Sequence, residues 1–497
     1  MRTALLAAAA LLLGLASCKS DKQEAALQNG QCDTYVGVSV RFPAPETRAL
    51  PDDHNKLDGE WQGRDVIKTI KVYVATTSNG TTTISSDQFT EANFGGINNG
   101  ILAPNLAVEA KSGDKVKVYV VINDVNNKVT SILDQKAANG ATFDDEFKKA
   151  VAVAAAINDV AKYDNEKDIV LMTNETAPED VTIAPNVSKE DAIGGKANRV
   201  EVRVSRVASR AIVTVDDQVK KTIEIKRSFT DAKGVTTESK TATVTVKDIM
   251  YQVTGSALQF NVLEDRTNWK VADDVYSFTP ASKDWTALAT EAAGKMLFSD
   301  AEGYKAAIVK ADNTLDNVKA ALGNEKFSKF VLPVTHAEGK YMKGNTTMFE
   351  IKATFTVDQI DGAAADETVK TVFLGLSDGK FYSTKEKAEA MDVTVTGTDY
   401  QKKQSAKEYK NGEMYYYIWL NPDVLYSDKD KTISESPTVR NQVYHAHITG
   451  FGEMGVADKD EIKPDEPLET KKTHLSVQLQ VLPWTIHSYT VDLINRY

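Results

Sequence analysis

Apolar and polar residues alternate along most of the chain after residue 34, so that every second side chain is apolar. The runs with this period are rich in Val, Ile, Thr and Tyr and end at Gly, Asn, Asp or Pro, which is typical of β-strands. The clearest runs are 66–74, 116–122, 200–204, 211–215, 241–246, 349–357, 369–374, 393–396, 415–420 and 443–448. Many short strands between turn signals predict an all-β chain built of β-sandwiches.

Helical patterns are few. Residues 144–162 place apolar side chains on one stripe with a period near 3.6, and acidic residues stand in the first turn. The stripe consists of Phe147, Ala150, Val151, Ala154, Ile157 and Val160. Residues 304–322 show a weaker version of the same pattern. We expect both segments to be short helices that cover a sheet face or a loop.

The chain begins like an exported protein. A basic start is followed by an apolar run over residues 4–15, which is shorter than the about 20 residues of a membrane-spanning helix and has the length of a secretory signal. The run ends in the tetrapeptide LASC at 15–18, which resembles a bacterial lipobox. This pattern predicts cleavage before Cys18 and acylation of the cysteine, because several acyl chains give stable anchoring. An ordinary signal peptide with a chance cysteine is the alternative.

Two segments at opposite ends of the chain have the pattern of removable strands. The first is 35–42, whose apolar face consists of Val36, Val38, Val40 and Phe42. The stretch that follows, 43–53, carries three prolines, which keep it extended and outside a β-ladder. Arg48 is therefore expected in an exposed loop that suits an Arg-specific protease. A plain N-terminal linker is the alternative.

The second removable strand is the C-terminal segment 473–497, which follows a charged, proline-containing linker at 457–472. Extended, its about 19 patterned residues span roughly 60 Å at ~3.3 Å each. The alternation of apolar positions changes phase around Pro483, which implies bulges or bends in the strand. If the segment were exposed to water, its apolar side chains and unpaired backbone would favour pairing with other strands. Its apolar positions are Leu475, Val477, Leu479, Val481, Trp484, Ile486, Tyr489, Val491 and Leu493.

Together the two segments predict strand donation. If the first strand fills a groove in the precursor, cleavage at Arg48 would release it and open an apolar slot. The C-terminal strand of another copy could then add to the opened sheet. Such a contact is heterologous and does not close, so it builds a filament.

Composition and charge exclude several classes of protein. The chain has 497 residues, with 59 Lys and Arg against 70 Asp and Glu and a net charge of −11. This balance argues against nucleic acid as a partner, because a phosphate backbone needs clustered cations. The chain has two cysteines, Cys18 and Cys32, so neither a disulfide-rich scaffold nor a cysteine-cluster metal site is expected.

No arrangement of residues in the sequence predicts catalysis. We find neither a Gly-x-Ser-x-Gly elbow nor a phosphate-binding glycine loop. His445 and His447 form the one close histidine pair and share a face of their strand, where two imidazoles could meet a metal. Their strand lacks a carboxylate ligand, so we expect a polar face. No metal, no cofactor and no enzymatic activity is expected.

Six blocks of sequence carry a resemblance to a known family. They are GEWQGRD (59–65), VKVYVVIND (116–124), KGNT (343–346), YYYIWLNP (415–422), PTVRNQVYHAHI (437–448) and VLPWTIHSY (481–489), of which the last three are the most specific. These blocks resemble the shaft fimbrillins of the minor (short) fimbriae of Porphyromonas-type Bacteroidales, within the Bacteroidetes fimbrillin family.

The resemblance implies an all-β dominated fold of two transthyretin-like β-sandwich domains with a few short helices, completed by strand exchange. An Arg-rich junction at 205–210, where two strand patterns meet, indicates the domain boundary. Arg48-Ala49 matches the position at which an Arg-specific gingipain cuts the family's precursors. The implied segments are a lipoprotein signal peptide (1–17), a propeptide (18–48), an N-terminal domain (49–208), a C-terminal domain (209–456), the linker (457–472) and a donor strand (473–497).

The resemblance also implies a location and partners. The precursor is expected as an outer-membrane lipoprotein and the mature form in extracellular fimbriae. Expected partners are other copies of the chain, anchor and tip accessory fimbrial proteins, the gingipain-type protease, and host or bacterial surface receptors. Two other interpretations stay open. One is a fimbrial tip or accessory protein, or a monomeric surface lipoprotein, that binds a glycan or protein. The other is a secreted hydrolase, for which we find no site.

Overall fold

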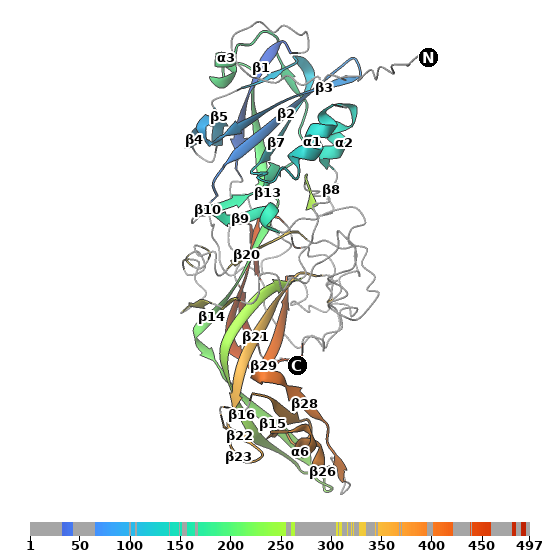
Figure 1. Cartoon of the computed structure of the whole chain (residues 1–497), viewed down its shortest axis with the longest axis vertical. Coiled ribbons are helices and arrows are strands. Elements are labelled where there is room, and N and C mark those ends of the chain that lie inside the picture. The colour runs from blue at the N-terminus through green and yellow to red at the C-terminus, as the bar shows by residue number, and fades with distance from the viewer. Residues whose placement is uncertain are drawn as a thin grey trace, which may run out of the picture. The chain divides into compact units, whose positions relative to one another are not determined.

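A computed structural model gives the fold of the chain (Figure 1). It describes residues 32–42, residues 65–263 apart from short gaps, and parts of 305–333. It also describes residues 343–458 apart from gaps, of which 421–437 is the longest, and residues 480–483 and 489–493.

Contacts between Cα atoms divide the chain into two compact units. Unit 1 consists of Met1–Ala44, Ile67–Lys149 and Leu171–Ser205. Unit 2 consists of Pro45–Val66, Ala150–Val170 and Arg206–Tyr497. Both units are therefore assembled from segments that are discontinuous in the sequence.

Unit 1 is built on one ten-stranded sheet. Its main path runs β3-β2-β7-β11-β13-β1-β5-β4, and beside this path β12 pairs with β7 and β6 pairs with β1. The strands are β1 Thr34–Arg41, β2 Thr69–Ser78, β3 Thr81–Thr90, β4 Phe94–Asn98, β5 Ile101–Pro104, β6 Ala107–Ala110, β7 Gly113–Ile122, β11 Met172–Asn174, β12 Val181–Ile183 and β13 Arg199–Arg206.

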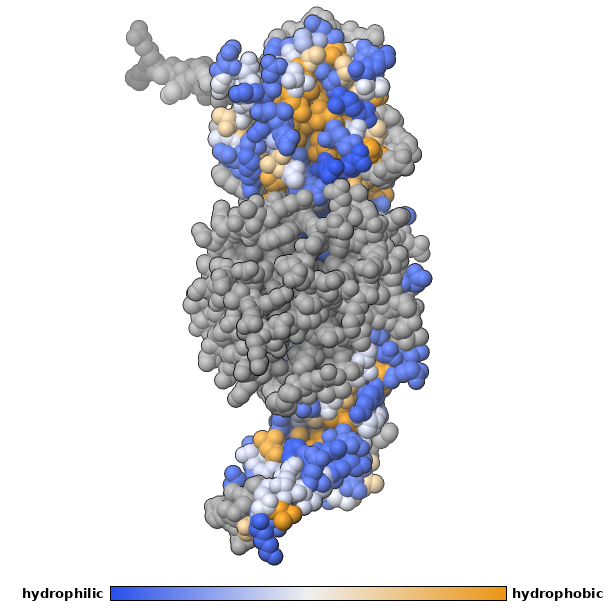
Figure 2. Space-filling model, turned by 180° about the vertical axis from the view of Figure 1, so that it is seen from behind, coloured by the Kyte–Doolittle hydropathy of each residue, from blue (hydrophilic) through white to orange (hydrophobic). Residues whose placement is uncertain are grey.

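Alternate side chains of this sheet enter one hydrophobic core. They come from both halves of the sheet, so the sheet closes over the core as a sandwich. The core includes Ile70, Val72 and Val74 of β2, Val116, Val118, Val120 and Ile122 of β7, Val36, Val38 and Val40 of β1, and Val202 and Val204 of β13. Figure 2, which shows the face opposite to that in Figure 1, has a band of hydrophobic side chains between hydrophilic ones on unit 1.

Two short helices, α1 (Thr130–Ala137) and α2 (Phe143–Lys148), cover the outer face of β2 and β7. The ring of Phe143 in α2 packs against Tyr73 and Tyr119, with 5.2 Å between ring centroids in both pairs. Aromatic pairs at this distance add to the free energy of burial. The outer face of these strands is thus a second, smaller core.

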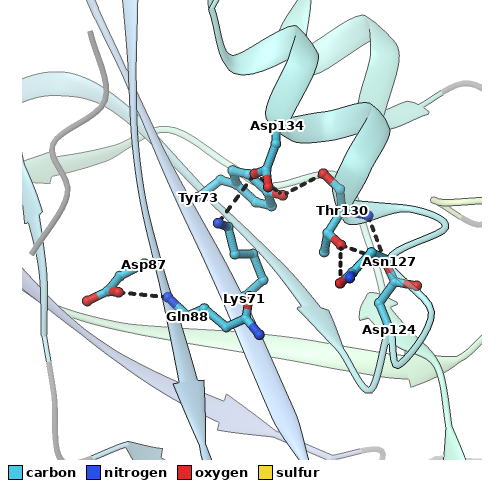
Figure 3. A network of polar contacts seen from close by, with 8 residues as sticks. All are labelled: Lys71, Tyr73, Asp87, Gln88, Asp124, Asn127, Thr130 and Asp134. Carbon is cyan, nitrogen blue, oxygen red and sulfur yellow. Dashed lines mark hydrogen bonds and ion pairs between the residues drawn. The ribbon is translucent and has the colours of Figure 1, made fainter. Parts of the chain in front are cut away.

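Polar contacts fix the position of α1 (Figure 3). The Tyr73 hydroxyl donates to Asp134 of α1 at 2.9 Å, and Lys71 lies 3.4 Å from the same carboxylate. At the start of α1, the Asp124 carboxylate accepts from the amide of Thr130 at 2.6 Å and from its hydroxyl at 2.9 Å. Asp124 therefore pairs an amide that the first helical turn leaves without a partner.

Unit 2 contains a second sandwich. One sheet of six strands runs β19-β14-β30-β31, with β20 beside β14 and β32 beside β30. A sheet of five strands runs β15-β16-β21-β29, with β18 beside β16. The strands are β14 Ser209–Lys220, β15 Thr222–Thr230, β16 Thr236–Thr254, β18 Lys305–Ala306, β19 Ile308–Lys310, β20 Ser328–Val331, β21 Met348–Val357, β29 Glu413–Trp419, β30 Gln442–Phe451, β31 Gln480–Pro483 and β32 Tyr489–Leu493.

Both sheets of unit 2 send side chains into one core. Val213 of β14 and Tyr444 of β30 come from the first sheet, and Val244 of β16 and Ile351 of β21 come from the second. All four are at most 2% exposed. The arrangement is that of two packed sheets with a shared apolar interior.

Smaller elements complete the described parts of the chain. The paired strands are β8 Ala150–Val151 with β17 Phe260–Asn261, β9 Ala161–Asp164 with β10 Lys167–Val170, β22 Gln359–Ile360 with β23 Ala363–Ala364, β24 Val372–Gly375 with β25 Phe381–Tyr382 and β28 Ala406–Tyr409, and β26 Asp392–Thr394 with β27 Gln401–Lys403. The remaining helical elements are α3 Lys189–Ile193, α6 Lys385–Ala390, and the 3-10 turns η1 Glu91–Asn93, η2 Gly140–Thr142, η3 Ile157–Asp159 and η5 Lys410–Gly412.

The strand-dominated fold with a few short helices is confirmed. Each of the ten strands predicted from the alternation overlaps an observed strand. The predicted strand 443–448, for example, lies inside β30, and 116–122 lies inside β7.

Both predicted helices are confirmed only in part, by α2 and η3 within 144–162 and by the helical residues Asp316, Ala320 and Leu322 within 304–322. The helix predicted at 144–162 ends with α2 at Lys148, and the chain then pairs as β8 with β17. Within the helix predicted at 304–322, β18 pairs with β16 and β19 lies parallel to β14. Val and Ile residues favour strands, and a partner strand far along the chain decides between the two structures.

Candidate functional site

β1 is an inner strand of the unit 1 sheet, although it lies at the start of the described chain. It is parallel to β13, with Val38 opposite Val200. On its other side it is antiparallel to β6 and then to β5, with Val36 opposite Val108 and Val40 opposite Leu102. Removing β1 would therefore leave two sheet edges with unpaired backbone groups.

The apolar face of β1 fills the core of unit 1. Val36, Val38 and Val40 are at most 2% exposed, and the half-buried Phe42 packs against the same core. Full burial of such a side chain is worth about 1.5–3 kcal/mol, so the three valines contribute roughly 5–9 kcal/mol before other costs. These residues point inward as the alternation predicts, and their displacement stays a prediction.

Side-chain contacts on the other face connect β1 to both neighbours. The Tyr35 hydroxyl donates to Glu109 of β6 at 2.8 Å, and Arg41 donates twice to Glu201 of β13, at 2.5 and 2.9 Å. Burial and the bond to Glu109 raise the pKa of Tyr35 to about 12. The bonds from Arg41 lower the pKa of Glu201 below its ordinary value, although partial burial opposes this.

The start of β1 is held by a further set of hydrogen bonds. The side-chain amide of Asn198 donates to the Thr34 hydroxyl at 2.9 Å and to the Tyr35 carbonyl at 3.1 Å. The Asp33 carboxylate accepts from the amide of Ser112 at 2.6 Å and from its hydroxyl at 2.8 Å. Burial alone would raise the pKa of Asp33, but these bonds and Lys111 bring it below its ordinary value.

The helix α3 lies directly over β1 at Gly37. A Cβ at Gly37 would lie 2.2 Å from the carbonyl oxygen of Ala192 in α3. Gly37 does not have a positive φ, so the close approach of another backbone requires the glycine here. Our sequence interpretation missed this contact, although a glycine inside a regular strand is a known signal for it.

The two described strands of the C-terminal segment, β31 and β32, lie along β30 of their own chain. β31 is antiparallel to the first half of β30, with Tyr444 opposite Val481. β32 is parallel to the second half, with Ile448 opposite Val491. The predicted bend is confirmed, because the two strands run in opposite directions along β30.

Other predicted site residues are only partly covered by the structure. Tyr489 and Leu493 belong to β32. Leu475, Val477, Leu479, Trp484 and Ile486 lie outside the described residues, and so do Cys18, Arg48 and Ala49. Lipidation, cleavage and strand donation therefore stay predictions. Among the helices in the described ranges, none is long and apolar enough to span a membrane.

His445 and His447 are buried beside Thr214 of β14. The Thr214 hydroxyl lies 2.7 Å from His445 Nε2 and 2.8 Å from His447 Nδ1, and His447 Nε2 lies 3.2 Å from Asp216. Burial, with a smaller effect of His447, lowers the pKa of His445 well below its ordinary value. In the part of the chain that the structure describes, no three His, Cys, Asp or Glu side chains are placed to hold a metal ion.

The sequence is similar to fimbrial subunits along its whole length. A family model for the C-terminal part of fimbrillin, the major fimbrial subunit protein type IV, matches residues 407–490. Two minor fimbrium subunits Mfa1 from Porphyromonas gingivalis are each 29% identical to the chain, over 98% of it and 98% of their own length. The chain therefore resembles fimbrillin in its C-terminal part and the minor fimbrium subunit along almost all of its length. A solved fimbrilin (fimA) from Porphyromonas gingivalis W83 is 14% identical, with a TM-score of 0.40 over 94% of this chain and 99% of its own.

The region matched by the family model contains β29, β30 and β31. It thus includes both β30 and the first described strand of the C-terminal segment, β31, which pairs with β30. The other half of the candidate site, β1 with its two neighbours, lies within the range matched by the two Mfa1 subunits, which covers almost the whole chain.

Proposed function

We propose that this protein is a fimbrillin, the structural subunit of a fimbrial shaft, and that its copies join by exchanging strands. The observation that carries the proposal is the position of β1, an inner strand whose three valines fill the core of unit 1. Along the sequence, β1 is joined to the rest of unit 1 through the segment that contains Arg48.

Cleavage after Arg48 would weaken the binding of β1 without changing any contact that it makes. A strand that is tethered to its groove has an effective concentration in the millimolar range. After cleavage the strand is part of a separate peptide that is lost to a dilute solution. The groove is then left with an apolar floor and two open edges, which favours the entry of another strand.

The C-terminal segment of another copy is suited to this groove. In its own chain, β31 and β32 pair with β30 alone among the described strands, so each uses one backbone ladder. A strand in the place of β1 pairs on both sides. Transfer from the edge of one copy to the groove of another would therefore gain backbone hydrogen bonds as well as apolar burial.

We also propose a life cycle for the protein. The precursor is acylated at Cys18, reaches the outer membrane and is cut at Arg48-Ala49 by a gingipain-type protease. The mature subunit polymerises into extracellular fimbriae together with anchor and tip proteins, and the fimbriae adhere to host or bacterial receptors. In this proposal the role of the subunit is structural and not catalytic.

Deletion of residues 473–497 tests the proposal. Full-length protein and the deletion variant are treated with an Arg-specific protease and followed by size-exclusion chromatography and electron microscopy. We expect fibres from the full-length protein and cleaved, folded monomers from the variant. Normal fibres from the deletion variant would contradict strand donation. A full-length protein that is cleaved but stays monomeric would favour a tip subunit or a monomeric lipoprotein.

The substitution Arg48→Ala is the matched control. It leaves the C-terminal segment intact and removes the predicted cut, so we expect a monomeric precursor under the same conditions. Cleavage at Arg64 would be detected by N-terminal sequencing of the product. Fibres from a precursor that is shown to be uncut would contradict the role of β1.

A further inference from the structure

We propose that α3 selects the strand that replaces β1 and fixes its register. This inference rests on the proposed strand exchange and adds the position of each donor residue in the groove. Its structural basis is one close approach, between the backbone of α3 and Gly37 of β1. Any strand that replaces β1 in the same register places one of its residues at the position of Gly37, beneath α3.

Backbone atoms make the contact at Gly37. A Cβ there would lie 2.2 Å from the carbonyl oxygen of Ala192 and 2.8 Å from its carbonyl carbon. Ala192 is fully buried. Because Cβ atoms essentially never come within 3.0 Å of another heavy atom, α3 has to shift when any residue other than glycine lies beneath it, and the shift grows with the size of that residue.

Hydrogen bonds at both ends resist this shift. At the first turn of α3, the Ser188 hydroxyl accepts from the amide of Asp191 at 3.1 Å. At the last turn, Arg199 of β13 donates to the carbonyl of Ile193 at 2.5 Å. The second bond joins α3 to the strand beside β1. A large residue beneath α3 is therefore disfavoured relative to a small one.

One register of the C-terminal segment places a small residue under α3 and three apolar side chains in the groove. In this register Leu475, Val477 and Leu479 take the places of Val36, Val38 and Val40. The residue beneath α3 is then Ser476. A shift of two residues brings Gln478 or His474 to the same point, and both are much larger than serine.

Polar groups of the acceptor favour the same register. Loss of β1 leaves the carboxylates of Glu109 and Glu201 without their partners on that strand. With Ser476 beneath α3, His474 stands beside the first carboxylate and Gln480 beside the second. Both side chains can donate a hydrogen bond. A shift of two residues toward the C-terminus would place the apolar Leu482 beside Glu201.

The second apolar run of the segment fits the groove less well. With Tyr489, Val491 and Leu493 inward, a tyrosine takes the place of a fully buried valine, which overpacks the core. The β-branched Thr490 would then lie beneath α3. The structure therefore favours the first run, Leu475 to Leu479, as the part that occupies the place of β1.

Cysteine cross-linking measures the register. Ala107 of β6 stands opposite Gly37, so it would stand opposite Ser476 after exchange. The pair Ala107→Cys with Ser476→Cys is compared with the matched pair Ala107→Cys with Gln478→Cys. Both native cysteines lie before Arg48 and leave with the propeptide. Directly opposite residues have Cβ atoms about 4.5–5.5 Å apart, which a disulfide can bridge with little movement.

We expect oxidised polymers of the first pair to give a ladder of covalent multimers on a non-reducing gel, and polymers of the second pair to give monomers. A ladder from the second pair, or from neither pair while polymers form, overturns the register. Failure of the chain without cysteine substitutions to polymerise after cleavage would instead contradict the strand exchange on which the inference rests.

The size of the residue under α3 provides a second measurement. Ser476→Leu is expected to slow polymerisation of the cleaved protein by about tenfold or more. Ser476→Ala keeps a small side chain at the same position and should slow it by about twofold at most. Equal rates for the two variants, or no effect of Ser476→Leu, would overturn the steric role of α3.

Discussion

At the scale of single residues, His445 is an uncharged group in the interior of unit 2. The ring is fully buried on β30, and Thr214 of the neighbouring strand β14 lies within hydrogen-bond distance of both His445 and His447. Burial holds the pKa of His445 well below 6.5. The folded state therefore keeps this imidazole neutral at a pH where the unfolded chain takes up a proton.

We expect acid to destabilise unit 2 through His445. Below about pH 6.5 the unfolded state binds more protons than the folded one, so the free energy of unfolding falls as the pH falls, by up to about 1.4 kcal/mol per pH unit. The variant His445→Gln keeps a polar side chain and lacks this proton, so its melting temperature should fall less between pH 7 and pH 5. Thermal melts of both proteins test this. Parallel pH profiles would show that other groups cause the acid sensitivity.

At the scale of elements, β1 and the C-terminal segment differ in how many neighbours they have. β1 has a strand on each side and a helix over its outer face. β31 and β32 pair with β30 alone among the described strands. In the proposed exchange, β31 and β32 leave β30 when the C-terminal segment enters a neighbouring copy, so their pairing within their own chain would oppose assembly.

A disulfide that holds β31 on β30 should therefore block polymerisation. Val443 and Leu482 are directly opposite in this antiparallel pair. We expect the cleaved variant with Val443→Cys and Leu482→Cys to stay monomeric when oxidised and to polymerise when a reductant is added. The matched control is Thr77→Cys with Thr82→Cys, a facing pair of β2 and β3 that lies outside both exchanged strands. Fibres from the oxidised first variant, with its disulfide verified by mass spectrometry, would contradict the release step.

The elements that the sequence predicted are those whose pattern is local. The alternation in β1 is complete within eight residues, so it predicted both the strand and the inward valines. The contact of Gly37 with Ala192 joins segments far apart in the chain, and no local pattern contains it. The interruption of the helix predicted at 144–162 has the same cause, because β8 becomes a strand only by pairing with β17. The carboxylate near His447 likewise comes from β14, not from the strand of the histidine.

At the scale of the whole molecule, the two parts of the proposed joint belong to different units. The slot of β1 is in unit 1, and the C-terminal segment is in unit 2. One copy can therefore receive a strand and donate another at the same time. Each joint uses two different surfaces, so it is heterologous, and growth continues in one direction without closing into a dimer.

A copy that cannot accept a strand and a copy that cannot donate one should form a heterodimer that does not grow further. A copy with Arg48→Ala keeps β1, so it can donate but not accept. A cleaved copy without residues 473–497 can accept but not donate. Mixed in equal amounts after the protease is inhibited, they should form a heterodimer by light scattering, while each alone stays monomeric. Longer polymers from this mixture would mean that a second contact drives assembly, and absence of the heterodimer would mean that the exchanged strand is not the link. Small amounts of either copy should also shorten wild-type fibres, because each blocks growth at one end.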